Sequence, residues 1–235
     1  MQTFKSFLNL FLQSSCPLCQ RPAEGELCKY CHRHLQNSEL DNPSQLWYGE
    51  LPIFAWGAYG GILKRAIAAL KYENQPQLSR PLGHWLGKAW IASIASNGTK
   101  NLTVLPIPLH PTRRKQRGFN QAELLAKSFC EYTGLPMQPA GLERVRDTKA
   151  QFGLSPSERE QNLADAFRLG KGFHGHRHPV LLLDDIYTSG ATARAAAKTL
   201  RQQGIRVYGL VAVATPPKPK SRETSFPLPN HQDDA

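Results

Sequence analysis

Hydrophobic positions along the chain follow two patterns: a helical spacing of three to four residues, and short unbroken runs. Residues 62–70 repeat apolar side chains at helical spacing, with basic residues on the other face, which predicts an amphipathic helix. Three further segments are predicted as helices, one of which begins at Asn120, a residue type that caps helix N-termini. The predicted helices cover residues 62–70, 82–96, 120–132 and 190–203.

Short, mainly apolar runs predict buried strands, because a strand covered on both faces has no polar side. The predicted strands cover residues 102–109, 179–183 and 205–214. The last two flank the helix at 190–203, and this spacing is typical of a βαβ crossover, which joins parallel strands. We therefore predict an α/β fold with a mainly parallel sheet flanked by helices.

The chain of 235 residues is long enough for one medium α/β domain and a small appendage. We expect the domain at 46–215, preceded at 1–45 by a helix and a cysteine-rich appendage and followed at 216–235 by a disordered tail. The apolar stretch at 4–12 is too short to span a bilayer and has no small-residue cleavage site after it, which favours a docked helix. We expect a cytoplasmic protein with no membrane span.

Positive charge is concentrated in one part of the chain. The formal net charge is +11, and residues 61–130 carry eleven Lys or Arg side chains against two Glu, a net charge of +9. Such a block favours a polyanionic partner, namely pyrophosphate, a nucleotide or a nucleic acid. The alternative is a basic surface that serves solubility alone.

Four of the five cysteines form one set of two Cys-x2-Cys pairs with eight residues between them. Two such knuckles supply a tetrahedral sulfur site, which predicts a small structural zinc ribbon. The ligands are Cys16, Cys19, Cys28 and Cys31. Disulfides are the first alternative, although a cytoplasmic chain keeps its thiols reduced. A redox-active pair is the second, and we expect neither pair to open a helix after a strand.

Residues 184–192 directly follow a predicted strand and read Asp-Asp-Ile-Tyr-Thr-Ser-Gly-Ala-Thr. In open parallel sheets, ligands bind beyond the carboxyl ends of the strands, and the N–H groups at a helix N-terminus bind phosphate. Small residues let the backbone approach the phosphate, and hydroxyls donate to it. The predicted phosphate-binding residues are Thr188, Ser189, Gly190, Ala191 and Thr192.

The two carboxylates before this loop, Asp184 and Asp185, cannot bind phosphate directly because both are negative. They suit ribose hydroxyls, which need acceptors, and can hold Mg²⁺ through water. We expect both at a strand end, outside the core. The segment is therefore predicted to bind both ends of a ribose 5-phosphate, the phosphate and the ribose hydroxyls. Asp184 and Asp185 are the candidate catalytic residues.

The segment 184–192 resembles the motif with which type I phosphoribosyltransferases bind phosphoribosyl pyrophosphate (PRPP). The wider chain resembles the ComF/GntX family, also called competence protein F, which pairs a zinc ribbon with such a domain. The resemblance covers about residues 16–214. Its matching segments lie at residues 16–31, 70–72, 105–110, 117–122, 151–162 and 181–192.

The resemblance implies a type I phosphoribosyltransferase-like fold that binds PRPP with Mg²⁺. By analogy, the basic segment 111–119, which we expect to be a loop, meets pyrophosphate, since arginine forks suit phosphate oxygens. The candidate contacts are Arg113, Arg114 and Arg117, with Lys71 as a weaker one. The implied reaction displaces pyrophosphate from C1 of PRPP by a nitrogen nucleophile.

A second function stays open on the sequence. The family implies a link to DNA uptake or use. The alternative is a competence factor that binds single-stranded DNA, uses the PRPP site for binding or regulation, and meets other competence proteins. Aromatic side chains near the basic block, namely Tyr59, Tyr72 and Phe119, can stack on bases.

Overall fold

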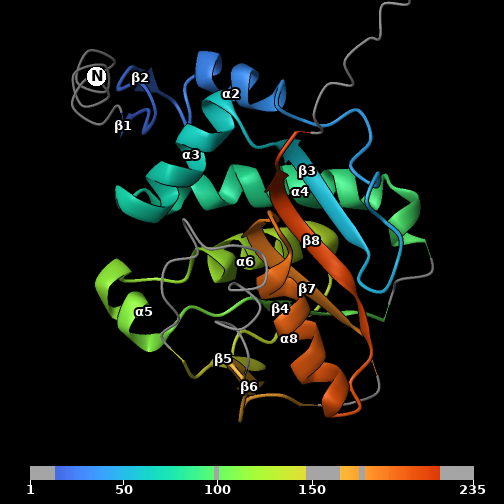
Figure 1. Ribbon diagram of the computed structural model, residues 1–235. Helices are drawn as coiled ribbons and strands as arrows, with labels where there is room; N and C mark the ends of the chain where they lie inside the picture. Colours follow the sequence, from blue (N-terminus) through green and yellow to red (C-terminus); the bar gives the residue numbers. More distant parts are fainter. Residues whose placement is uncertain (1–13, 98–100, 147–164, 175–177, 218–235) are drawn as a thin grey trace, which may run out of the picture.

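The computed structural model describes residues 14–97, 101–146, 165–174 and 178–217 (Figure 1). The helix expected at 4–12, the segment 151–162 and nearly all of the expected tail lie outside these ranges. Within the described ranges, no helix is long and apolar enough to cross a bilayer.

The core of the domain is a four-stranded sheet with the order β3-β8-β7-β4, in which every neighbouring pair is parallel. The strands are β3 Ile53–Ala58, β4 Thr103–Pro106, β7 Val180–Ile186 and β8 Val207–Thr215. All three predicted strands are present, and the predicted α/β class with a parallel sheet is confirmed. Because the strands are parallel, their carboxyl ends meet at one edge, where the segments that follow β4 and β7 are neighbours.

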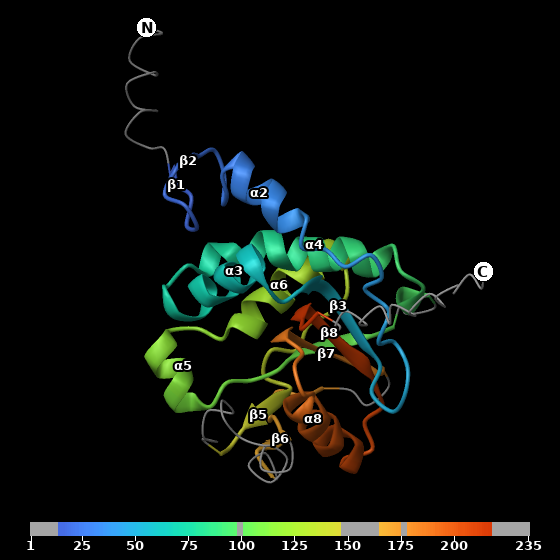
Figure 2. The ribbon, with the colours of Figure 1, turned by 45° about the horizontal axis from the view of Figure 1, so that its top comes forward.

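Both faces of the sheet are covered by helices, because successive side chains of a strand point to opposite faces. Leu181 and Leu183 of β7 lie in a core shared with α3, α4 and α6, whereas Val180 and Leu182 lie in a core shared with α8. Figures 1 and 2 show these two layers on either side of the sheet. The helices are α3 Gly61–Tyr72, α4 Ser79–Ile91, α6 Gln121–Thr133 and α8 Ala191–Gln202.

Asn120 caps α6, as predicted, and also ties this helix to the sheet. Its side-chain oxygen accepts a hydrogen bond from the backbone N–H of Ala122 (3.1 Å), and its amide nitrogen donates to the backbone oxygen of Ile107 (3.0 Å). Asn120 is buried, so both bonds are shielded from water. The capping residue therefore fixes where the basic segment before α6 lies relative to the end of β4.

The basic segment expected as a loop at 111–119 is instead largely helical. It forms α5, Pro111–Arg117, with proline in the first turn and the His110 imidazole accepting a hydrogen bond from the Thr112 N–H (3.4 Å). Gly118 ends the helix in the left-handed region, with φ 84°. The helix expected at 82–96 is also shorter, because α4 ends at Ile91 and a 3-10 turn, η2 Ile94–Ser96, follows it.

Strand β3 was not predicted, although its six residues form an unbroken apolar run after Pro52. It lies at the edge of the sheet, where the preceding segment covers it through bridges of Glu39 with Gly57 and of Leu46 with Ile53. The remaining unpredicted elements are short. They are β1 Ser14–Ser15, β2 Pro22–Ala23, α2 Lys29–Gln36, η1 Pro76–Leu78, β5 Leu142–Arg144 and β6 Phe167–Leu169.

Candidate functional site

The segment 184–192 has the expected strand–loop–helix arrangement. β7 carries both carboxylates and stays paired with β8 through this region, since Asp184 lies opposite Ala212 and Ile186 opposite Ala214. A short turn follows, and α8 begins after Gly190, which has φ 75° and ψ 0°. This left-handed conformation favours glycine over any residue with a side chain.

The two carboxylates point to opposite faces of β7. The Asp185 side chain is 5% exposed, and its Oδ1 accepts a hydrogen bond from the Lys71 ammonium at the end of α3 (2.8 Å). Asp184 is half-buried, and its Oδ1 accepts from the backbone N–H of Asp185 (2.8 Å). The expectation that both carboxylates lie outside the core is wrong for Asp185, because β7 continues to Ile186 and α3 covers that face.

Burial and charge set the protonation of this cluster. Burial raises the pKa of Asp184 to about 7, the negative charge of Asp185 adds to this effect, and Lys71 opposes it. Burial alone would lower the pKa of Lys71, but the Asp185 carboxylate outweighs it and raises that pKa above its ordinary value. Lys71 and Asp185 therefore form an ion pair, and Asp184 keeps its proton to a higher pH than an ordinary carboxyl group does.

Two buried oxygens at the site have no hydrogen-bond partner among the described residues. They are Oδ2 of Asp185 and Oγ of Ser189. Leaving a buried polar group unpaired costs about 1–3 kcal/mol, so proteins usually satisfy such groups with water, an ion or a ligand. The first can only accept a hydrogen bond, whereas the second can also donate one. A small cavity of about 20 Å³ lies among Asp184, residues 186–193 and Leu210.

The turn before α8 leaves no room for a side chain at Gly190. A Cβ there would lie 2.8 Å from the Tyr187 ring and 2.8 Å from the Arg194 guanidinium. Arg194 also donates a hydrogen bond to the backbone oxygen of Ser189 (2.9 Å), which fixes the turn from the first turn of α8. Conformation and space therefore both require glycine at this position.

The four candidate pyrophosphate contacts lie in two places. Lys71 contacts Asp185 directly, and Arg117 stacks on Tyr72, the residue after Lys71, with its Cζ 5.3 Å from the ring centre. Arg114 forms an ion pair with Glu123 (3.1 Å) and lines a cavity of about 620 Å³ next to β5 and β6. Arg113 is half-buried in α5. Their roles remain predictions.

The four cysteines of the ribbon converge as predicted. Their sulfur atoms all lie within 4.8 Å of one another, and the sulfurs of Cys19 and Cys28 are 3.5 Å apart. Burial opposes ionisation of Cys16, but nearby backbone N–H groups outweigh it and lower the pKa of this thiol to about 7. The cluster can hold a metal ion, because four convergent thiolates are the donor set of closed metal sites.

One expectation about these cysteines is wrong. The second pair does open a helix, since Cys28 is the N-cap of α2 and its sulfur accepts from the backbone N–H of Cys31. The convergence of four sulfurs, two of them from outside this helix, still distinguishes the cluster from an isolated redox pair.

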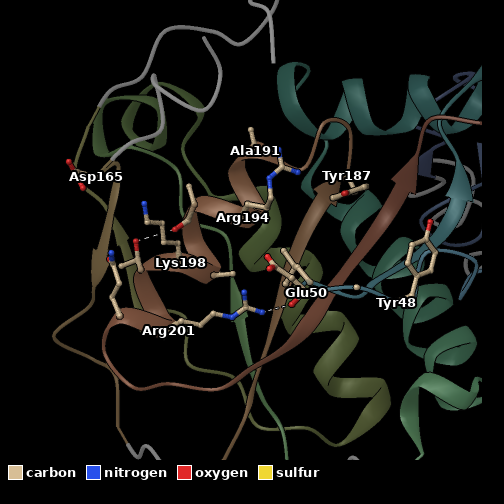
Figure 3. Close-up of a pocket in the computed structure, with 14 residues that line it drawn as sticks. Tyr48, Glu50, Asp165, Tyr187, Ala191, Arg194, Lys198 and Arg201 are labelled. Atoms are coloured by element: carbon tan, nitrogen blue, oxygen red, sulfur yellow. Dashed lines mark hydrogen bonds between the residues drawn. The ribbon is translucent and has the colours of Figure 1, made fainter. Parts of the chain in front are cut away.

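A larger cavity, of about 860 Å³, lies along α8 (Figure 3). Arg194, Lys198 and Arg201 line it from the helix, and Arg201 donates to the backbone oxygen of Glu50 on the opposite wall. The cavity adjoins the turn before α8 through Tyr187, but neither carboxylate of the pair lines it. We therefore place the candidate site at the strand end.

The chain is similar to curated bacterial proteins over most of its length. It is 30% identical to competence protein F of Haemophilus influenzae over 220 residues, which cover 86% of this chain and 92% of that protein. It is 27% identical to DNA utilization protein YhgH of Escherichia coli O157:H7, over 80% of this chain and 85% of that protein. It is 26% identical to competence protein ComFC of Bacillus subtilis, over 80% of this chain and 72% of that protein.

Among solved structures, the chain resembles the glutamine PRPP amidotransferase of B. subtilis with TM-score 0.34 and 22% identity, covering 59% of this chain and 26% of that one. It resembles the adenine phosphoribosyltransferase of Leishmania donovani with TM-score 0.39 and 11% identity, covering 84% and 87%. At these TM-scores the two likenesses carry no argument about fold, ligand or activity. No family model matches the chain.

Proposed function

The chain belongs to the competence protein F family, and on this premise we propose that residues 184–192 bind the ribose 5-phosphate part of PRPP. The phosphate lies at the N-terminus of α8, where the N–H groups of the first turn and the helix dipole favour negative charge. The hydroxyls of Thr188, Ser189 and Thr192 donate to it. The ribose hydroxyls donate to the carboxylates of Asp184 and Asp185.

The observation that carries this proposal is the pair of buried oxygens without partners on either side of the turn. Oδ2 of Asp185 needs a donor, and a ribose hydroxyl provides one. The Ser189 hydroxyl can donate, and a phosphate oxygen accepts. A ligand with a hydroxyl at one end and a phosphate at the other satisfies both, and ribose 5-phosphate is such a ligand.

Lys71 positions one carboxylate and leaves the other available. Its ammonium pairs with Asp185, so Asp184 is the carboxyl group that is left for a further cation, which would bind its ionised form. Asp184 is half-buried and offers carboxylate oxygens, the ligand type that Mg²⁺ takes, so the residues fit this ion. Bound with PRPP, Mg²⁺ would supply charge stabilisation for the departing pyrophosphate.

We further propose that the site supports phosphoribosyl transfer. In this reaction, the bond from C1 to the pyrophosphate oxygen breaks, and pyrophosphate leaves with the electron pair. A nitrogen nucleophile forms the new bond to C1 and releases a proton to water. Arg113, Arg114 and Arg117 of α5 are the candidates to bind the departing pyrophosphate, because guanidinium forks match phosphate oxygens.

The proposal is tested with two glycine variants. Gly190→Val places a side chain against Tyr187 and Arg194 in a strained conformation, so Mg²⁺-dependent PRPP binding should fall by more than about tenfold. Gly60→Val is the matched control: Gly60 also precedes a helix, but its backbone is extended and nothing lies within 4 Å. Equal binding by both variants would show that the ligand does not use this turn. Pyrophosphate release with a panel of amines and bases then tests transfer separately from binding.

We propose that the four-cysteine cluster holds a structural zinc ion. The support is the convergence of four sulfurs within 4.8 Å in a segment too small to form its own core. With four protein ligands the coordination shell is closed, so the metal stabilises the ribbon and has no open position for chemistry.

A second candidate function is binding of single-stranded DNA. Two observations favour it: relatives are named for competence and DNA utilization, and α5 carries Arg113, Arg114, Lys115 and Arg117 within seven residues. If this helix binds a strand, replacing these four residues by Ala weakens binding and flattens its dependence on salt, because fewer counterions are released. If the variant keeps its DNA affinity but loses PRPP, the charges serve the small ligand alone.

A further inference from the structure

Tyr72, the last residue of α3, is exposed and directly follows Lys71, which contacts the carboxylate pair. Its exposure is 75%, whereas the preceding Lys71 is largely buried and contacts Asp185 at 2.8 Å. The last turn of α3 therefore directs an ammonium to Asp185 and exposes an aromatic ring to solvent at the next residue. An exposed tyrosine is ordinary by itself, but the ring of Tyr72 has a partner.

The ring of Tyr72 is held by a fixed cation. The guanidinium of Arg117, from the end of α5, lies over the ring with its Cζ 5.3 Å from the ring centre. Arg117 also donates a hydrogen bond to the side-chain oxygen of Gln121, a buried residue in the first turn of α6. Three helices thus meet at this point and hold an aromatic ring and a guanidinium plane together at the border of the site.

We propose that Tyr72 and Arg117 form a stacking platform for a planar heteroaromatic base. This inference rests on the proposed function. A nucleotide consists of a phosphate, a ribose and a base in this order. In the proposed site the phosphate lies at the α8 N-terminus and the ribose at Asp185, so the base lies toward the turn that carries Lys71 and Tyr72. Aromatic rings and arginine planes bind bases of any sequence through stacking and cation–π attraction. An aliphatic amine has no ring to stack here, and its positive charge is repelled by Arg117, so a ligand with an aromatic ring gains more from this surface.

The same ring chemistry can come from a free nucleotide or from a base in a single strand. The test compares wild-type affinities, by calorimetry, for ribose 5-phosphate and for adenosine 5′-monophosphate, which differ by the base. The wild-type protein should bind the nucleotide roughly tenfold more tightly than ribose 5-phosphate, and this ratio of affinities measures the contribution of the base. Tyr72→Phe should keep the ratio. Tyr72→Ala should reduce it to about one without changing the affinity for ribose 5-phosphate.

A matched control lies in the ribbon, where Tyr30 is 53% exposed and carries Arg21 over its ring at 5.0 Å. Tyr30→Ala removes the same kind of pair away from the carboxylates and should leave the ratio unchanged. A wild-type ratio near one, or a ratio that survives Tyr72→Ala, overturns the platform.

The failure of the proposed function gives a different result. If ribose 5-phosphate does not bind, but the nucleotide binds and its affinity depends on Tyr72, the ribose assignment is wrong and the platform is supported. If neither ligand binds, both are overturned. Hexathymidylate, a short single strand, distinguishes a base in a strand from a free nucleotide. If hexathymidylate displaces adenosine 5′-monophosphate from the wild-type protein but not from Tyr72→Ala, the platform binds a strand. If it does not displace the nucleotide, the platform binds the free nucleotide.

Discussion

Two clusters of reactive side chains lie in this chain, and they are assembled in different ways. The four cysteines come from 16 consecutive residues, and their sulfurs converge within 4.8 Å through two local knuckles. The candidate ribose site also has a local part at 184–192, but its ion pair joins Lys71 to Asp185 across 114 residues. The first cluster depends on short-range turns, and the second depends on how α3 packs on the sheet.

This difference determines how each cluster should respond to mutation. A metal site in a segment without its own core loses its structure when a ligand is removed, while the rest of the chain keeps its core. A buried ion pair that joins a helix to a strand affects the whole domain, because removing one partner leaves the other charged and buried.

The largest effect is expected in the ribbon. The protein should contain about one zinc ion per chain, and Cys16→Ser or Cys28→Ser should lose the ion and unfold the ribbon, because three ligands do not close the shell. Metal analysis and circular dichroism measure this. Cys130→Ser is the control, since Cys130 lies in α6 outside the cluster. Metal-free protein of unchanged stability would contradict the zinc assignment.

The next effect concerns Lys71. Lys71→Met should lower the free energy of unfolding by about 3 kcal/mol, because the Asp185 carboxylate then stays buried without its partner. Lys64→Met, on the exposed face of the same helix, should change it by less than about 0.5 kcal/mol. Urea unfolding measures both. Adding Asp185→Asn to Lys71→Met should recover part of the loss, and equal effects for the two lysines would contradict the buried ion pair.

The sequence predicts the parts of the fold that are local in the chain. The strand at 179–183, the turn at Gly190 and the cap at Asn120 each depend on residues within a few positions, and all three are present. The burial of Asp185 was missed, because it follows from α3 packing over the end of β7, which no local pattern encodes.

Two secondary-structure errors have local causes that the sequence does contain. The segment 111–119 is predicted as a loop and carries no apolar stripe, yet Pro111 in the first turn and Gly118 after the last are helix boundary signals. Strand β3 follows a polar segment and is only six residues long, but its unbroken apolar run between Pro52 and Gly60 is typical of a buried strand.

A smaller effect is expected in the pH dependence of the free energy of unfolding, through Asp184. Burial and then the charge of Asp185 raise the pKa of Asp184 to about 7, so the folded state holds a proton that the unfolded state loses near pH 4. Stability from this group is therefore full below about pH 4 and declines as pH rises to about 7. Asp184→Asn should flatten this decline, measured by urea unfolding at about pH 5 and about pH 8. An unchanged slope would mean that Asp184 does not titrate in this range.

The smallest effect is expected at the surface ion pair of Arg114 and Glu123, whose side chains are partly exposed. Glu123→Gln should change the free energy of unfolding by less than about 1 kcal/mol, because solvent screens the pair. The same variant frees Arg114 of its carboxylate partner. If Arg114 binds pyrophosphate, PRPP affinity should therefore rise slightly, and a fall would argue that the ion pair positions Arg114 for binding.

The central claim, that the carboxylate pair accepts ribose hydroxyls, is tested most directly by comparing ribose 5-phosphate with 2-deoxyribose 5-phosphate in calorimetric titrations at about pH 8, where Asp184 is ionised. A hydrogen bond to a charged acceptor should make the ribose ligand bind about tenfold tighter or more. Asp184→Asn should reduce that ratio. Equal affinities of the wild-type protein for the two sugars, or no binding of either, would contradict the account.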